Sequence, residues 1–164
     1  MPHNIRTHLA GSSGLRPPPP AGNPKPLNIL ASFTDGEEAQ IRVKANEDAF
    51  VTIFNVEENG RVSQIFPRPR APQHLLPTGQ EMIFPSDMER EMGIHLRVRT
   101  PPKHSSALES NLVIATKKNI QFFDGKPNGP DGEPPMLTDL MAELAEIVNL
   151  STWDHAVVGY KISK

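Results

Sequence analysis

Apolar and polar residues alternate along much of the chain after Leu27, a pattern typical of strands with one buried face. Ala39, Ile41 and Val43 alternate with charged or amide residues and predict one such strand. Residues 49–56 (AFVTIFNV) carry apolar side chains on both faces. This second strand is therefore expected to be central in its sheet.

A β-hairpin is predicted after this central strand. Asn59-Gly60 tolerates the positive φ angles of a type I′ turn, and residues 61–66 return as an antiparallel partner. The prolines that follow cannot donate ladder hydrogen bonds at alternate positions. We therefore expect the chain to leave the sheet and to run as an exposed loop through residues 67–79.

Four further segments have the composition of strands, namely residues 80–84, 93–100, 112–115 and 158–162. In the second of these, Arg97 and Arg99 alternate with apolar residues, which predicts a basic outer face. Ser86-Asp87, directly after Pro85, is typical of the cap of a short helical turn.

One longer helix is predicted in residues 136–149 (MLTDLMAELAEIVN). Its apolar residues recur at i, i+3, i+4 and i+7, while Asp139, Glu143 and Glu146 lie on the opposite side. A helix flanked by strands packs its apolar stripe on a sheet, which we favour over binding of a partner or a lipid surface. The predicted fold is mainly β: an antiparallel β-sandwich or open barrel with one late amphipathic α-helix packed on it.

Proline content separates the front of the chain from the rest. Seven of the 18 prolines precede residue 27, where large apolar residues are few and no period is present. We expect residues 1–26 to be a disordered proline-rich tail, either a plain linker or a tether that docks in a proline-binding groove. Residues 27–164 are expected to form a single β-rich domain. From the residues at the start we expect no intact secretory signal, and no apolar run of ~20 residues is present to span a membrane.

Charge and cysteine content exclude several classes of function. The formal net charge of −2 gives no basic excess for nucleic-acid binding, which we do not expect. With no cysteine, the chain has no disulfide, no thiolate zinc site and no cysteine nucleophile. A cysteine-free chain is stable in reducing and oxidising compartments alike, so its location stays open.

Metal and cofactor sites are not predicted. The histidines at positions 3, 8, 74, 95, 104 and 155 stand singly, with none of the spacings of zinc ligands. Residues 124–133 superficially resemble a calcium loop. However, Lys126 occupies the third ligand position and Pro135 replaces the bidentate glutamate, so we expect a Gly/Pro-rich connector.

Catalytic motifs are also missing: there is no nucleophile elbow, no phosphate-binding loop and no dinucleotide fingerprint. The chain is therefore predicted not to be an enzyme. Arginine side chains suit anionic ligands through their planar donor fork, so we regard the basic residues of the hairpin, the loop and the 93–100 strand as a candidate interaction surface. The alternative is that these charges are ordinary solvated surface. The surface comprises Arg61, Arg68, Arg70, His74, Arg97 and Arg99.

Four stretches together resemble a bacterial domain-of-unknown-function family, number 4384. They are DAFVTIFNVEENGRVSQIFPRP, LPTGQEMIFPSD, NLVIATKK and the tryptophan before VVGYKI. The resemblance extends over residues 37–163. Its most specific part is the hairpin from Phe50 to Pro67, where Ile65 replaces the family's leucine.

The resemblance implies an accessory module without catalytic residues, attached in other members to envelope lipoprotein-like, peptidase-like or kinase-like parts. We therefore expect a non-catalytic module that mediates protein–protein contact or assembly in a bacterial envelope-associated system. A periplasmic or envelope location is implied by this analogy alone. The alternatives are a domain that binds a glycan or other anionic small molecule, and a regulator of a hydrolase encoded elsewhere. The oligomeric state is left open.

Overall fold

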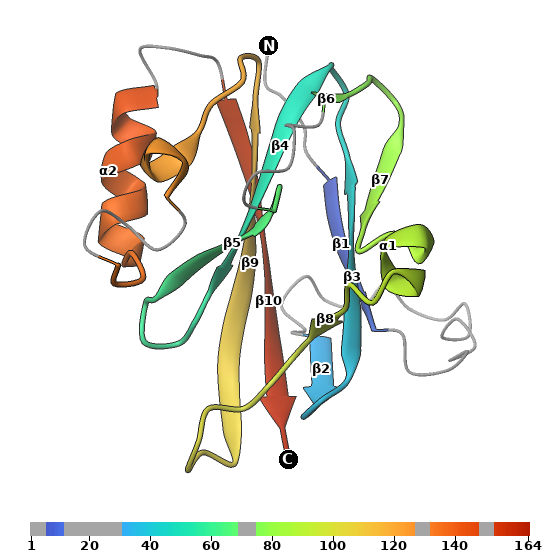
Figure 1. Cartoon of the computed structure of the whole chain (residues 1–164), viewed down its shortest axis with the longest axis vertical. Coiled ribbons are helices and arrows are strands. Elements are labelled where there is room, and N and C mark those ends of the chain that lie inside the picture. The colour runs from blue at the N-terminus through green and yellow to red at the C-terminus, as the bar shows by residue number, and fades with distance from the viewer. Residues whose placement is uncertain (1–5, 12–30, 69–74, 127–131, 148–152) are drawn as a thin grey trace, which may run out of the picture.

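The computed structural model describes residues 6–11, 31–68, 75–126, 132–147 and 153–164. Its strands form two sheets that lie face to face, and helix α2 (Leu137–Ile147) covers the outer side of the larger sheet (Figure 1). The strands of the described residues do not close into a barrel. Of the two predicted alternatives, the structure thus confirms a β-sandwich with a late helix.

The larger sheet has the strand order β2-β10-β9-β4-β5, with the short β6 also paired to β4. β4 is therefore central, as its two apolar faces predicted. β9 and β10 pair antiparallel along their whole length, whereas β10 and β2 form a parallel pair. The bounds are β2 Ala31–Thr34, β4 Ala49–Val56, β5 Val62–Phe66, β6 Leu75–Leu76, β9 Ser106–Thr116 and β10 Trp153–Ser163.

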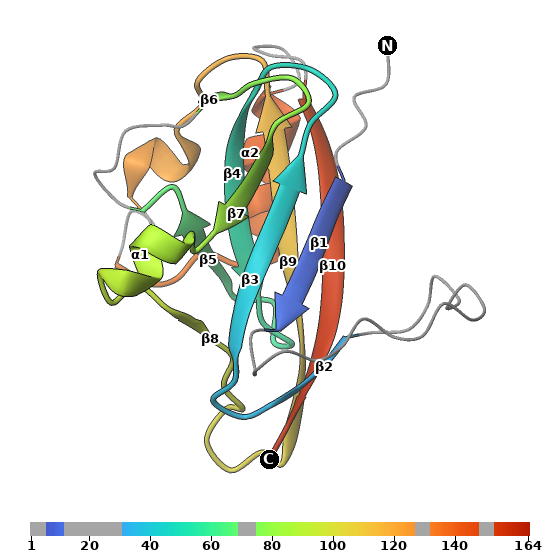
Figure 2. The same cartoon turned by 90° about the vertical axis from the view of Figure 1, so that its right-hand side faces the viewer.

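The smaller sheet is built on β3 (Glu38–Lys44). β1 (Arg6–Gly11) pairs with one edge of β3, and β7 (Glu81–Phe84) and β8 (Leu96–Arg97) pair with the other edge (Figure 2). Two expectations change here. β1 is a strand within the segment predicted to lack regular structure, and the predicted strand 93–100 is reduced to the two residues of β8.

The predicted hairpin of β4 and β5 is present, but its turn differs from the prediction. Within the turn only Gly60 has a positive φ, of 86°. A type I′ turn requires positive φ at both central residues, so that assignment is wrong. Gly60 N–H donates to the Glu57 carbonyl (2.9 Å), and the Asn59 side-chain oxygen accepts from Arg61 N–H (2.9 Å). The asparagine therefore closes the turn with its side chain.

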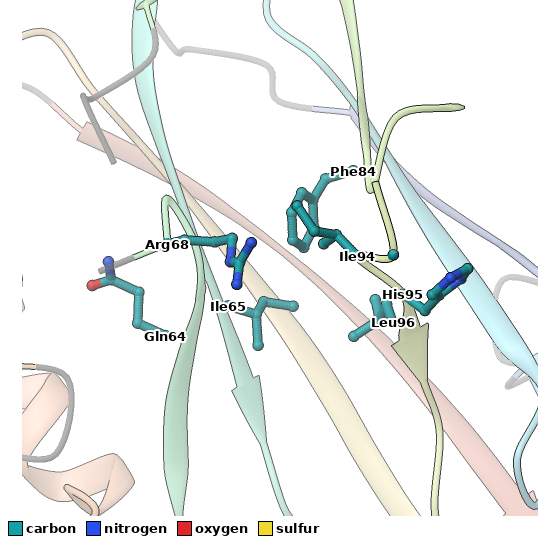
Figure 3. Close-up of a pocket in the computed structure, with 8 residues that line it drawn as sticks. Gln64, Ile65, Arg68, Phe84, Ile94, His95 and Leu96 are labelled. Carbon is teal, nitrogen blue, oxygen red and sulfur yellow. The ribbon is translucent and has the colours of Figure 1, made fainter. Parts of the chain in front are cut away.

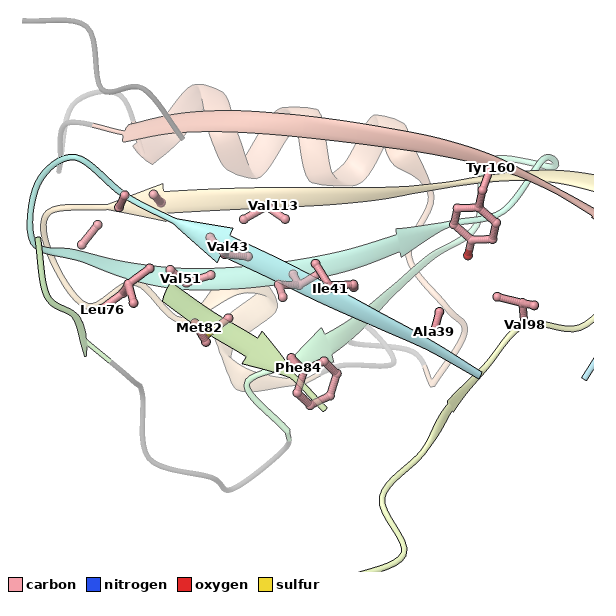
Figure 4. Close-up of a cluster of buried hydrophobic side chains, with 14 of the residues drawn as sticks. Ala39, Ile41, Val43, Val51, Leu76, Met82, Phe84, Val98, Val113 and Tyr160 are labelled. Carbon is pink, nitrogen blue, oxygen red and sulfur yellow. The ribbon is translucent and has the colours of Figure 1, made fainter. Parts of the chain in front are cut away.

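Two apolar cores hold three layers together. Between the sheets, Ile41 and Val43 of the smaller sheet pack with Val51, Ile53 and Val113 of the larger one (Figure 4). On the outer side of the larger sheet, the buried residues of α2 pack on Phe54 of β4, as predicted. This second core consists of Phe54, Val62, Leu112, Ile114, Phe122, Phe123, Leu140, Leu144 and Ile147.

The start of α2 is tied to the hairpin. Val62 N–H donates to the Pro135 carbonyl and Leu137 N–H donates to the Gly60 carbonyl, both at 2.8 Å. These bonds fix the helix over the sheet and also occupy one end of the outer edge of β5. No helix of the described residues has the length and apolar character needed to cross a membrane.

Candidate functional site

β5 of the larger sheet and β7 of the smaller sheet end next to each other. Each ends in a Phe-Pro dipeptide with a cis peptide bond, Phe66-Pro67 and Phe84-Pro85. The two phenylalanine rings pack with their centroids 5.2 Å apart. A pocket of about 350 Å³ lies beside this pair (Figure 3). It is lined by Gln64, Ile65, Arg68, Phe84, Gly93, Ile94, His95 and Leu96.

Apolar and polar residues share the walls of this pocket. Ile65 approaches from β5, whereas Phe84 of β7, Ile94 of the segment before β8 and Leu96 of β8 approach from the other side (Figure 3). Arg68 extends from the end of β5 across the same space. Ligand sites combine apolar walls with a few placed polar groups, and this volume is at the small end of their range of ~300–1,000 Å³. The pocket therefore has room for a single large side chain or a small ligand.

The short helix α1 (Asp87–Glu91) positions one wall of the pocket. Ser86 caps it: the Ser86 hydroxyl accepts from Glu89 N–H (3.2 Å), and the Glu89 carboxylate accepts from Ser86 N–H (2.7 Å). This capping box confirms the predicted helical turn. After the helix, Ile94 N–H donates to the Glu89 carbonyl (2.9 Å). The segment that carries Ile94 is thus fixed by backbone bonds.

Glu38 of β3 neutralises the cations at the outer rim. Its carboxylate lies 3.0 Å from His95 Nδ1, 3.2 Å from Arg90 and 3.4 Å from Arg97. Desolvation raises the pKa of Glu38, but hydrogen bonds from His95 and Arg90 outweigh it and hold the pKa below its usual value. Arg97 and His95 therefore share the carboxylate of Glu38 as their partner.

Arg68 differs from these rim residues. It is exposed, and no carboxylate or hydrogen-bond acceptor within the described residues pairs with its guanidinium. Its donors are directed over apolar walls rather than over an acidic group. The arrangement provides a free cation beside a hydrophobic surface.

Comparison with family models assigns this chain to a protein family. The family model described as "Domain of unknown function (DUF4384)" matches residues 32–119, more than half of the chain. The chain belongs to this family. The DUF4384 match includes both walls of the pocket and excludes α2 and β10. Comparison with curated proteins and with solved structures found no match.

The structure separates the basic residues that the sequence grouped. Arg61 lies at the hairpin tip, at the opposite end of β5 from Arg68. Arg97 is paired with Glu38, and Arg99 is exposed two residues beyond β8. Arg70 and His74 lie outside the described residues. Of the candidate residues that the structure describes, Arg68 alone lines the pocket of this DUF4384 domain.

Reasoning from charge missed the uncharged residues that line the pocket. Gln64, Ile65, Phe84, Ile94 and Leu96 belong to the pocket but not to the predicted surface. A usable signal was present, because the tripeptide Ile-Phe-Pro occurs twice, at residues 65–67 and 83–85. Both copies end a strand, and together they bring the two strand ends into contact.

The described histidines and carboxylates form no cluster of three or more that is suited to a metal ion. His95 contacts Glu38, and His155 packs beside the ring of Trp153 at 5.7 Å. Half of the calcium-like segment 124–133, residues 127–131, lies outside the described residues.

Proposed function

We propose that this DUF4384 domain is a non-catalytic interaction module that binds a partner protein through the pocket between β5 and residues 93–96. The observation that carries the proposal is Arg68, a cation without a partner in the described structure, beside the apolar side chains of Ile65, Phe84 and Ile94. An exposed apolar surface with one directed polar group is typical of recognition sites.

The chemistry of the pocket favours binding over catalysis. The lining residues that the structure describes include no hydroxyl, thiol or carboxylate side chain. The His95 ring is hydrogen-bonded to Glu38, which also interacts with two arginines. By analogy with the family, we place the module in a bacterial envelope-associated assembly.

Affinity capture with the full chain as bait tests the proposal. The wild type, Arg68→Glu and the matched control Arg61→Glu are compared, because the control makes the same charge change at the hairpin tip. We expect a protein that the wild type and Arg61→Glu retain and that Arg68→Glu loses. The captured protein is then purified and titrated against each variant by calorimetry. Equal binding by all three variants, or no reproducible partner, would refute the proposal.

A small anionic ligand, such as an acidic glycan, is the second candidate. Its support is the pocket volume of about 350 Å³ together with the free guanidinium of Arg68. A thermal-shift screen with acidic sugars and short carboxylic acids discriminates the two candidates. A ligand present at ~100 times its Kd stabilises the fold by ~2.7 kcal/mol, a shift that such a screen detects.

A further inference from the structure

We infer that the partner presents an extended segment that adds to the open edge of β5, places an apolar side chain in the pocket and pairs a neighbouring carboxylate with Arg68. This inference rests on the proposed function and specifies the chemistry of the partner. Three observations carry it: a sheet edge that the described residues leave open, a pocket with apolar side chains next to that edge, and a cation at the pocket's rim.

The outer edge of β5 is only partly used. At one end, Val62 N–H donates to the Pro135 carbonyl, so the backbone groups of Val62 point away from β4. Backbone groups alternate in direction along a strand, and those of Gln64 therefore point outward as well. Within the described residues, no element pairs with the edge at Gln64. A chain laid beside β5 would extend the sheet there.

The pocket lies directly beside this edge. Gln64 and Ile65 line it and also form the edge of β5, at the irregularity where Phe54 pairs with Gln64 and Ile53 pairs with Phe66. A segment laid beside Gln64 therefore brings its neighbouring side chains toward Ile94 and Leu96. In strand addition, main-chain hydrogen bonds provide affinity and pockets for alternate side chains provide specificity. The available volume suits one branched or aromatic side chain.

Charge complementarity defines the second element of the partner. Arg68 is the cation that faces the pocket without an anion among the described residues, whereas Arg90 and Arg97 share Glu38. A guanidinium binds a carboxylate through two parallel hydrogen bonds, so an Asp or Glu next to the inserted side chain matches it.

The helix before the pocket wall adds adaptable apolar area. Met88 and Met92 lie one turn apart in and directly after α1 and are 70% and 66% exposed, respectively. Flexible methionine side chains repack against different apolar partners.

Selection from a phage library of random heptapeptides on the full-length chain tests the inference. Enriched peptides are synthesised and their affinities are measured for the wild type, Arg68→Glu and Arg61→Glu. We expect an apolar residue beside Asp or Glu, and affinity at least about tenfold weaker for Arg68→Glu with little change for Arg61→Glu. Hydrogen exchange of the Gln64 amide is expected to slow when the peptide is bound.

Several results would overturn the inference. Enriched peptides without an acidic residue, equal binding by Arg68→Glu, or an unprotected Gln64 amide each contradict strand addition with carboxylate pairing. If affinity capture retains a partner while the library yields no binder, the inference fails and the proposed function stands. If sedimentation shows self-association that Arg68→Glu abolishes, the occupant is a second copy of this chain and the inferred partner is wrong.

Discussion

Two polar regions of the described structure differ in their hydrogen bonding: an interior network on the larger sheet and the pocket that contains Arg68. In the interior network the polar side chains bond to one another, whereas Arg68 has no bonded partner among the described residues. In the interior network, defined here as Asn55, Glu109, Asn111 and Tyr160, the Asn55 amide donates to Tyr160 Oη (2.8 Å) and to Glu109 (3.2 Å). Tyr160 Oη in turn donates to Glu109 at 2.7 Å. In the pocket, Arg68 has no such partner in the described structure.

This contrast separates a structural polar site from the proposed binding site. The interior network joins β4, β9 and β10, where Asn55 pairs with Asn111 and Glu109 pairs with Tyr160 in the strand register. Because buried polar groups cost free energy when they are unpaired, mutual bonding makes these residues part of the fold. An exposed guanidinium keeps its hydration, so Arg68, which has no partner among the described residues, is expected to contribute little to folding.

The largest expected effect on stability comes from truncating one isoleucine in each of the two regions. Ile162 lies next to Tyr160 on the inner face of β10 and is fully buried, whereas Ile94 in the pocket wall is only partly buried. Ile162→Ala is expected to lower the free energy of unfolding by about 2–5 kcal/mol, since it leaves a cavity. Ile94→Ala is expected to lower it by about 1 kcal/mol. Urea unfolding followed by the fluorescence of Trp153, the sole tryptophan, measures both.

Removal of one hydroxyl tests the interior network itself. Tyr160→Phe keeps the ring that packs on Phe33 (centroids 5.6 Å apart) but removes the bonds to Asn55 and Glu109. We expect a loss of about 1–3 kcal/mol, because two partly buried polar groups lose a partner. Affinity of the pocket for a captured partner should not change. If stability is unaffected, water satisfies the same groups and the network is not a structural site.

Alkaline pH gives a smaller, graded test of the same network. Burial, followed by the hydrogen bond and charge of Glu109, raises the pKa of Tyr160 above its ordinary value of 10.0. The folded state holds this proton more tightly than the unfolded state. The contribution of protonated Tyr160 to the free energy of unfolding is therefore complete below pH 10 and is lost as the pH rises further. The slope is at most about 1.4 kcal/mol per pH unit.

Phenolate absorbance makes this titration specific, because Tyr160 is the sole tyrosine of the chain. Ionisation should coincide with unfolding rather than precede it. Tyr160→Phe serves as the control for the lysines that titrate in the same range, and its stability should fall less steeply with pH. A phenolate signal at pH 10 in the folded protein would contradict the buried, hydrogen-bonded tyrosine.

Periodicity in the sequence was sufficient to predict the layers of the fold. β4 matches the predicted residues 49–56, and the stripe of Leu140, Leu144 and Ile147 packs on the sheet as expected. Periodicity could not predict which sheet each strand joins, because that depends on pairing between distant residues. Leu96, for example, pairs with Ala39 in the smaller sheet.

The candidate site was less accessible to sequence reasoning for a related reason. Arg68 and Arg97 look equivalent in the sequence, and only the fold places Glu38 beside one of them. Charges are paired across long separations that a pattern does not encode. The apolar walls of the pocket have the same composition as core strands, so Ile65 and Ile94 could not be recognised as lining residues from their neighbours in the chain.

The smallest expected change in stability is also the most decisive for the contrast. Arg68→Glu reverses a charge that has no partner in the described structure, so the free energy of unfolding should change by no more than about 0.5 kcal/mol. Arg61→Glu, equally exposed, should behave in the same way. Urea unfolding of both variants and the wild type measures this. A loss above about 1 kcal/mol for Arg68→Glu alone would mean that Arg68 holds an internal partner. The pocket cation would then be part of the fold, and the distinction between the two polar regions would fail.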